Sequence, residues 1–241
     1  MMQHTNALGQ PVGFPLGDWK VPPVPPRTPL VGRTCTVLPL DPAAHSADLH
    51  AANILESTGR NWTYLVYGPF AQAAQHRAWA DSVAAASDPM FHTILDAATG
   101  KALGVASLMR IDNKVGVIEV GHINYSPLLQ QTIAATEAMY LLMKRVFDLG
   151  YRRYEWKCDS CNLPSKAAAA RLGFQYEGRF RQATLYKGRN RDTDWFSILD
   201  SEWPRLKTAF ETWLDPANFD AAGRQRQSLS ALTKSALAGI R

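Results

Sequence analysis

Apolar positions change their period along the chain, and these changes predict alternating strands and helices. From Ala135 to Leu149 the apolar residues recur every three or four positions, which predicts a long helix over 132–149 that ends at Gly150. Similar patterns predict helices over 43–56, 71–87, 163–172 and 201–214. Runs rich in β-branched and aromatic residues predict strands over 34–40, 91–96, 102–111, 115–125, 154–158, 174–181 and 195–199. Strands that occur both in succession and between helices favour an α/β (α+β) protein, with one mixed sheet carrying helices on its faces.

The two ends of the chain differ from its middle. Seven of the fifteen prolines fall within residues 1–30, which excludes regular helix or a central strand there and predicts an extended arm. A position on the domain surface is favoured by the apolar residues Phe14, Leu16, Trp19 and Val21, and a loose leader is the alternative. The domain proper is expected over 31–215. A basic tail follows over 216–241, with an amphipathic helix suggested by Leu229, Leu232, Leu237 and Ile240.

Length and composition narrow the class of protein. The 241 residues suffice for one domain with extensions and a well-developed core. Hydrophobic residues make up 46% of the chain and charged residues 20%, which excludes wholesale disorder. The net charge of +5 suits an anionic ligand and gives only weak support to nucleic acid as a partner. The lack of a long apolar run, of a secretory signature and of a disulfide framework predicts a cytoplasmic protein that does not engage membranes.

Two helix starts carry candidate chemistry. The loop residues Gln130 and Gln131 lead into a helix at Thr132, where unpaired backbone N–H groups and the helix dipole favour a phosphate or pyrophosphate. A solvated helix start without a ligand is the alternative. In a later segment Asn162 is placed to cap a helix, with Ser165 one turn inside. An ordinary capped helix is the alternative there.

The motifs in these segments follow one another in a characteristic order. They are Ala135-Thr136-Glu137-Ala138, Asn162-x-x-Ser165, Leu172-Gly173-Phe174 and Glu177-Gly178-x-x-Arg181. In order and spacing, residues 28–214 resemble the GNAT superfamily of acyl-CoA-dependent N-acyltransferases, and more narrowly its RimJ/RimL branch. The resemblance implies a GNAT-type central sheet, mixed but mostly antiparallel, with helices on both faces. It also implies acetyl-CoA as co-substrate and a primary amine as acceptor, either a protein N-terminus or a small-molecule amine.

The same resemblance implies where acetyl-CoA binds. Backbone groups of His122, Ile123 and Asn124 are expected to pair with the pantetheine amides. Near the pantetheine and the leaving sulfur the resemblance places Asn162, Ser165 and Lys166. The pyrophosphate loop corresponds to Gln130, Gln131, Thr132, Ile133, Ala134, Ala135 and Thr136. Ile133 stands where the family has its first glycine, which lets the backbone approach a phosphate closely. Binding then requires the Ile133 side chain to point away from the phosphate.

By the same resemblance the amine attacks acetyl-CoA directly, so the site needs a base and a proton donor for the leaving thiolate. Glu119 is the candidate base, because it lies on the strand beside the pantetheine arm. Strand alternation places Glu119 on one face with Gly121, Ile123 and Tyr125, and it places His122 on the other face with Val120 and Asn124. The candidate proton donors are Ser165 and Tyr186. The alternatives are a Glu119 paired with an arginine and a buried, hydrogen-bonded His122.

Other features keep more than one interpretation. A group of aromatic residues either lines an acceptor pocket or belongs to the core: Trp62, Tyr64, Tyr67 and Phe70. A basic cluster is formed by Arg179, Arg181, Lys187, Arg189 and Arg191. It either binds the 3′-phosphate of CoA, an acidic substrate or RNA, or it is a solvated hairpin without a ligand. Cys158 and Cys161 have no second pair of ligands, so no metal is expected. A catalytically inactive CoA-binding or partner-binding module on the same fold is the alternative function, and both a monomer and a homodimer remain open.

Overall fold

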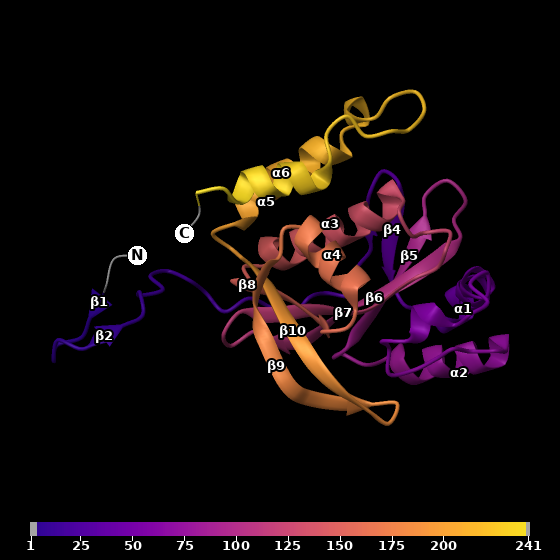
Figure 1. Ribbon diagram of the computed structural model, residues 1–241, viewed down its shortest axis with the longest axis horizontal. Coiled ribbons are helices and arrows are strands. Elements are labelled where there is room, and N and C mark those ends of the chain that lie inside the picture. Colours follow the sequence, from indigo (N-terminus) through magenta and orange to yellow (C-terminus); the bar gives the residue numbers. More distant parts are fainter. Residues whose placement is uncertain (1–3, 240–241) are drawn as a thin grey trace.

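An eight-stranded sheet forms the centre of the computed structural model, which describes residues 4–239 (Figure 1). Its order is β3-β4-β5-β6-β7-β8-β10-β9, and every neighbouring pair is antiparallel except β7 and β8. The strands are β3 (Leu30–Val31), β4 (Cys35–Pro39), β5 (Met90–Asp96), β6 (Ala102–Asp112), β7 (Val117–Tyr125), β8 (Arg153–Asp159), β9 (Gln175–Tyr186) and β10 (Arg189–Leu199). The expected mixed, mostly antiparallel sheet is therefore confirmed.

Helices cover both faces of this sheet (Figure 1). On one face lie α1 (Pro42–Asn53) and α2 (Ala73–Val83), which pack on a small apolar cluster around Leu49 and Phe91. On the other face lie α3 (Ile133–Asp148), α4 (Leu163–Arg171), α5 (Trp203–Leu214) and α6 (Leu229–Leu237). Two short 3-10 helices, η1 (Arg60–Trp62) and η2 (Pro216–Asn218), lie in the connections. No helix within 4–239 is long and apolar enough to span a membrane.

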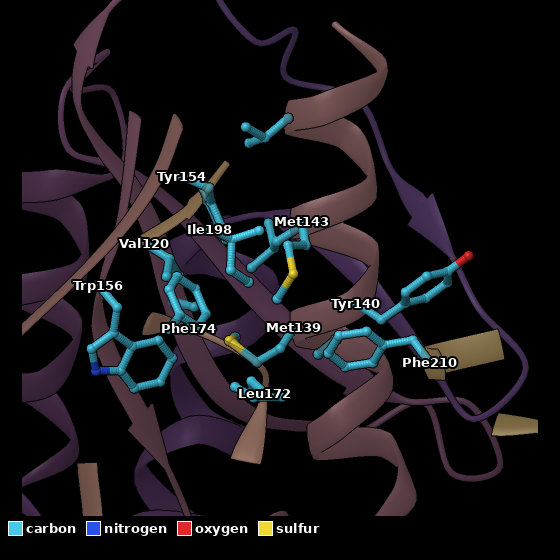
Figure 2. Packing of buried hydrophobic residues seen from close by; sticks show 14 of the residues in the cluster. Val120, Met139, Tyr140, Met143, Tyr154, Trp156, Leu172, Phe174, Ile198 and Phe210 are labelled. Carbon is cyan, nitrogen blue, oxygen red and sulfur yellow. The ribbon is translucent and has the colours of Figure 1, made fainter. Parts of the chain in front are cut away.

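The main core lies between the sheet and α3 (Figure 2). Met139, Met143 and Val146 recur at helical spacing and are buried, as is Leu142 beside them. They meet large side chains from β8 and the residues after α4, among them Tyr154 and Phe174. Each such fully buried side chain stabilises the fold by roughly 1.5–3 kcal/mol relative to an exposed one. This apolar face fixes α3, and with it the loop at its N-terminus.

The predicted elements are all present, with shifted ends. The largest difference is in β9 and β10, which extend to Tyr186 and from Arg189, well beyond the predicted strands over 174–181 and 195–199. Nearly all of β9 is exposed, so its side chains carry no apolar alternation that would reveal a strand. Backbone pairing with β10 on one side holds it in place.

The second part of the N-terminal arm, residues 19–28, contacts the domain at several points. The hairpin of β1 (His4–Thr5) and β2 (Pro11–Val12) stands away from the sheet (Figure 1). Trp19 anchors the arm, because its indole donates a hydrogen bond to the carbonyl of Gly150 over 3.1 Å. Within the apolar set of the arm, Phe14, Leu16 and Val21 are 65%, 44% and 57% exposed, whereas Trp19 contacts the domain.

Part of the C-terminal prediction can be compared with the structure. Leu229, Leu232 and Leu237 do fall in one helix, α6, which packs beside α5 and α4. Ile240 lies outside the described residues.

Candidate active site

The parallel strands β7 and β8 separate halfway along their length, and this separation opens the site. They pair only from Val117 opposite Arg153 to Val120 opposite Trp156. Beyond that point β7 continues to Tyr125 and β8 to Asp159 with no pairing between them in the part of the chain described. The opened strands form the two sides of a cleft of about 1930 Å³. Backbone N–H and C=O groups along the opening are free to pair with an extended ligand.

A β-bulge at His122 shapes one side of the cleft. Ser107 pairs with Gly121 and Val105 pairs with Asn124, so two residues of β7 stand opposite one residue of β6. His122 adopts a positive φ of 50°, which is uncommon for a residue with a side chain. The bulge turns the backbone beside the cleft at the point where β7 leaves β8.

This bulge overturns the predicted alternation of β7. Ile123 and Tyr125 pack into the core under α3, away from the face that carries Glu119 and Gly121. His122 instead lies on the Glu119 face, where its ring stacks on Tyr67 at 5.6 Å between centroids. The extra residue shifts the period by one, so every side chain after it changes face. Burial, together with nearby arginines, lowers the pKa of His122 to about 4, and the ring is neutral near pH 7.

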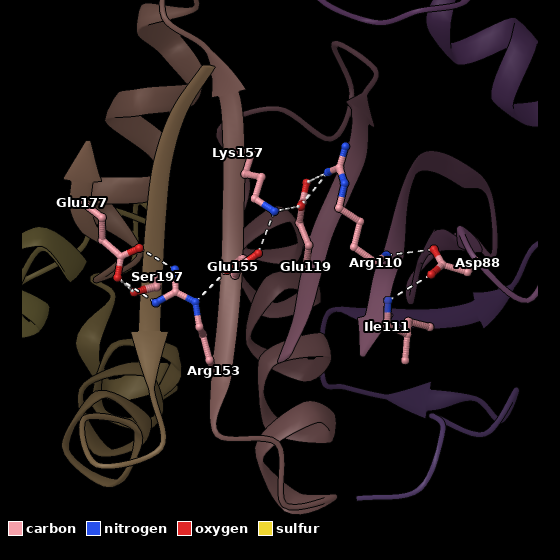
Figure 3. Close-up of polar contacts among 9 residues, drawn as sticks. All are labelled: Asp88, Arg110, Ile111, Glu119, Arg153, Glu155, Lys157, Glu177 and Ser197. Atoms are coloured by element: carbon pink, nitrogen blue, oxygen red, sulfur yellow. Dashed lines mark hydrogen bonds and ion pairs between the residues drawn. The ribbon is translucent and has the colours of Figure 1, made fainter. Parts of the chain in front are cut away.

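Glu119 is held in a buried ion-pair network (Figure 3). Its side chain is 3% exposed and accepts two hydrogen bonds from Arg110, at 2.7 and 2.6 Å. Lys157 lies 2.9 Å from the same carboxylate and 2.7 Å from Glu155. Glu119 and Glu155 are direct neighbours on the parallel strands, so Lys157 bridges two carboxylates that would otherwise repel each other. The alternative of a Glu119 paired with an arginine therefore describes its observed contacts, and Glu119 also lines the cleft.

The network extends across the same face of the sheet (Figure 3). Arg153 donates to Glu155 over 2.6 Å and forms a two-pronged ion pair with Glu177, which also accepts from Ser197. Arg153, Glu155 and Lys157 alternate along β8 and so share this face. The result is a row of fixed charges that leads to Glu119.

The start of α3 forms the end wall of the cleft. Thr132 is the N-cap, and its hydroxyl accepts a hydrogen bond from the backbone N–H of Ala135 over 3.1 Å. The preceding N–H groups of the first turn have no acceptor within the helix, as at any helix start. Gln131 adopts a positive φ of 61°, which turns the loop sharply before the cap. Ile133 packs against the main core, so its side chain is directed at least partly away from the opening.

The start of α4 forms the opposite wall. Asn162 caps the helix by accepting from the N–H of Ser165 over 3.2 Å, as predicted. Ser165 accepts a hydrogen bond from the indole of Trp156 over 3.0 Å. Lys166 points elsewhere, because its ammonium lies 2.6 Å from the fully buried Asp194. Of the predicted site residues, all line the cleft except Lys166 and Ala134.

Tyr186 reaches the cleft from β9, but its proton is engaged. The phenol donates a hydrogen bond to Asp159 over 2.8 Å. Burial and the hydrogen bond to the Asp159 carboxylate raise the pKa of Tyr186 to about 12. This geometry favours Ser165 over Tyr186 as a source of a proton for a leaving thiolate.

The remaining predicted groups divide between core and cleft. Tyr64 lines the cleft and donates to the carbonyl of Cys161 over 3.1 Å, while Trp62 and Tyr67 pack with Phe70. The aromatic segment therefore supplies both cleft wall and core. Of the five basic residues on β9, β10 and their turn, only Arg191 lines the cleft.

Sequence reasoning missed two side chains of the β8–β10 wall. Lys157 lies over the ring of Trp195, 3.7 Å from its centroid, and Phe180 stacks on Trp195 at 4.4 Å. Lys157 and Trp195 are paired across β8 and β10, so their contact depends on strand register. The alternation of charged residues in β8 was the available signal, but register is not written in the sequence.

Comparison with known proteins places the chain in a family. The acetyltransferase (GNAT) domain matches residues 37–175, more than half of the chain. A comparison with curated proteins gave no match.

Solved structures agree with this assignment. A GCN5-related N-acetyltransferase from Brucella melitensis is 47% identical, with a TM-score of 0.88 over 91% of this chain and 100% of its own. A probable GNAT-family acetyltransferase from Chromobacterium violaceum is 40% identical, with a TM-score of 0.75 over 81% of this chain and 98% of its own. The microcin C7 self-immunity acetyltransferase MccE, solved with acetyl-CoA and AMP, shares the fold at 20% identity, with a TM-score of 0.61 over 70% of this chain and 93% of its own. The chain therefore belongs to the GNAT family of acetyltransferases, which use acetyl-CoA as the acetyl donor.

Proposed function

We propose that this protein is a RimJ/RimL-like N-acetyltransferase that moves the acetyl group of acetyl-CoA to a primary amine by direct attack. The observation that carries the proposal is the opening between β7 and β8 beside the bulge at His122. It offers unpaired backbone to an extended pantetheine arm, and the N-terminus of α3 lies at one end of the same cleft.

The proposal assigns parts of acetyl-CoA to parts of the cleft. The pyrophosphate lies on the first turn of α3, where Ile133 takes the place of a glycine and packs toward the core. The pantetheine amides pair with the backbone of His122, Ile123 and Asn124. Asn162 and Ser165, at the start of α4, flank the thioester end.

The chemical step needs one proton removed and one returned. The amine nitrogen attacks the thioester carbonyl, the carbon–sulfur bond breaks, and the products are an amide and the thiol of CoA. Glu119 takes the proton of the attacking amine, directly or through a water molecule. Arg110 is the partner that can yield, since its side chain is 56% exposed whereas that of Lys157 is 8% exposed. Ser165 relays a proton to the thiolate and recovers one from solvent, while Glu119 gives its proton up to solvent, so the enzyme is restored.

The acceptor enters from the face that carries α1 and α2. Tyr64, Arg191 and Trp195 line this part of the cleft together with Glu119. The segment of Trp62 and the β9–β10 turn meet above it, because Lys187 donates to the carbonyl of Trp62 over 2.7 Å. Either a small amine or the flexible N-terminus of a protein fits an opening bounded in this way.

The second candidate is a CoA-binding module without transferase activity. The observation in its favour is that both oxygens of Glu119 are already paired with cations. Such a protein would bind acetyl-CoA and release no CoA in the presence of any amine.

Two measurements test the proposal. Calorimetric titration with acetyl-CoA should show micromolar binding, and a Gln131→Glu variant should weaken it, because Gln131 is exposed in the phosphate loop and a carboxylate there repels the pyrophosphate. Release of free CoA is then followed with amines and with peptides that have a free N-terminus, and N-acetylated peptides serve as controls. Binding without turnover on any acceptor would favour the inactive module, and no binding would contradict both functions.

A further inference from the structure

The C-terminal segment forms part of the cleft wall. Its loop residues Phe219, Gly223, Arg224 and Gln225 line the same cleft as the first turn of α3 and the outer turns of α4. These residues lie outside 37–175, the part matched by the GNAT domain. The wall is therefore built by a segment that the motifs of the domain do not include.

This loop is held firmly in its position. Asn218 is buried and donates to the carbonyls of Trp213 and Gln227, both over 3.1 Å. Trp213 donates to the side chain of Gln225 over 2.7 Å, and its ring meets that of Phe219 edge-on at 5.3 Å. These contacts hold in place a loop that is otherwise largely exposed.

The helix α6 ties the same segment to α4. The hydroxyl of Thr233 lies 3.0 Å from the carbonyl of Leu229 and 3.2 Å from that of Arg171. The Arg171 guanidinium donates to Thr136 on α3 over 3.0 Å. The C-terminal segment, α4 and α3 are thus linked around one end of the cleft.

Two guanidinium groups line this end. Arg171 is half-buried and forms no ion pair with any carboxylate among residues 4–239. Arg224 uses its Nε to reach Asp220 over 2.8 Å, which leaves the two outer nitrogens of its fork directed to solvent or ligand. Arg171 is a partly buried cation without a carboxylate partner near the start of α3, and the 81% exposed Arg224 lines the same cleft. This combination suits phosphate groups.

We propose that the C-terminal segment completes the nucleotide end of the acetyl-CoA site, with Arg224 and Arg171 binding phosphate groups of the CoA nucleotide. The inference rests on the proposed use of acetyl-CoA by this cleft. The shared chemistry is a phosphate, which is either the ribose 3′-phosphate or the pyrophosphate. Arg224 contributes binding and takes no part in the acetyl transfer.

The test compares Arg224→Gln with Lys234→Gln, a matched loss of charge on the exposed side of α6. Calorimetry with acetyl-CoA should show roughly ten-fold weaker binding for Arg224→Gln, an effect that shrinks at high salt, and no change for Lys234→Gln. S-acetyl-pantetheine, which lacks the nucleotide, should bind both variants and the wild type equally.

Dephospho-CoA separates the two phosphate sources. If Arg224 binds the 3′-phosphate, the wild type should lose affinity for dephospho-CoA, and Arg224→Gln should bind CoA and dephospho-CoA equally. If Arg224 binds the pyrophosphate, the variant should weaken both ligands by the same factor. Unchanged acetyl-CoA affinity in Arg224→Gln would overturn this inference and leave the proposed function standing. A wild type that binds no acetyl-CoA would overturn both.

Discussion

The two faces of the β7–β8 pair differ in polarity although the same two strands build them. The face toward α3 carries Ile118, Val120, Tyr154 and Trp156, all buried in the main core. The opposite face carries Glu119, Glu155 and Lys157, which are also buried but charged. The apolar face gains free energy by leaving water, whereas the charged face loses hydration that its ion pairs only partly return.

This contrast separates stability from function. An apolar face of similar volume would be at least as stable as a buried ion network, so the network is weak evidence for a stabilising role. The network lies at the cleft, so we expect it to serve activity. We therefore expect substitutions on the α3 face to change stability alone, and substitutions on the charged face to change activity as well.

The sharpest test of the contrast removes the central cation of the network. Lys157→Met should destabilise the protein by about 3–5 kcal/mol, because Glu119 and Glu155 would remain buried side by side without their shared partner. Urea unfolding measures the loss. Lys207→Met is the control, since that lysine is exposed at 37% and lies 3.9 Å from its partner Glu211. A loss below about 1 kcal/mol would show that the network is not a tightly coupled unit.

On the apolar face, a cavity should affect folding only. Leu142→Ala removes a fully buried side chain beneath α3 and should cost about 2–5 kcal/mol in the free energy of unfolding. Acetyl-CoA affinity, measured well below the transition temperature, should stay within two-fold of the wild type. Leu163→Ala, at a site 67% exposed, is the matched control and should change stability little. A large loss of affinity in folded Leu142→Ala would break the separation between the two faces.

At the end of the network, a neutral isostere should separate charge from packing. Glu119→Gln keeps the shape of the side chain but removes the proposed base, so kcat should fall by roughly 100-fold or more. Lys157 keeps Glu155 as its partner, which limits the loss of stability. Paired measurements of kcat and of the free energy of unfolding are the decisive readout, because loss of a base lowers the rate without a matching loss of stability. An unchanged kcat with lower stability would make Glu119 a structural ion-pair member.

The sequence predicts the parts of this site that depend on local pattern. The long helix, its start at Thr132 and the cap at Asn162 follow from apolar spacing and capping chemistry, which act within a few residues. The order of strands and helices indicates the mixed sheet for the same reason. Resemblance of the motifs then points to the family that the comparisons show.

Features that depend on register or on distant segments escape this reasoning. Gly121 stands directly before the bulge at His122, and an isolated glycine inside a strand pattern is a signal for a bulge. A strict period of two ignores this signal and therefore misplaces Ile123 and Tyr125. The contact of Lys157 with Glu119 requires knowing which residues of β7 and β8 lie opposite each other. Arg224 lines the cleft because its loop is tied to Trp213 of α5 through Asn218 and Gln225, and these tertiary contacts have no local signature.

The smallest expected effect is the pH dependence of stability that buried histidines cause. His76, His92 and His122 each have a pKa lowered to about 4, mainly by burial. Below about pH 6.5 the unfolded chain therefore binds protons that the folded chain does not, so stability should fall as pH drops toward 4. Between pH 7.5 and 6 the free energy of unfolding should fall by about 1 kcal/mol less in His92→Gln than in the wild type. Urea unfolding at both pH values measures this difference. His4→Gln, on the arm, should leave that difference unchanged. An equal pH dependence in His92→Gln and the wild type would mean that His92 is protonated in the folded protein, and that its burial does not keep it neutral.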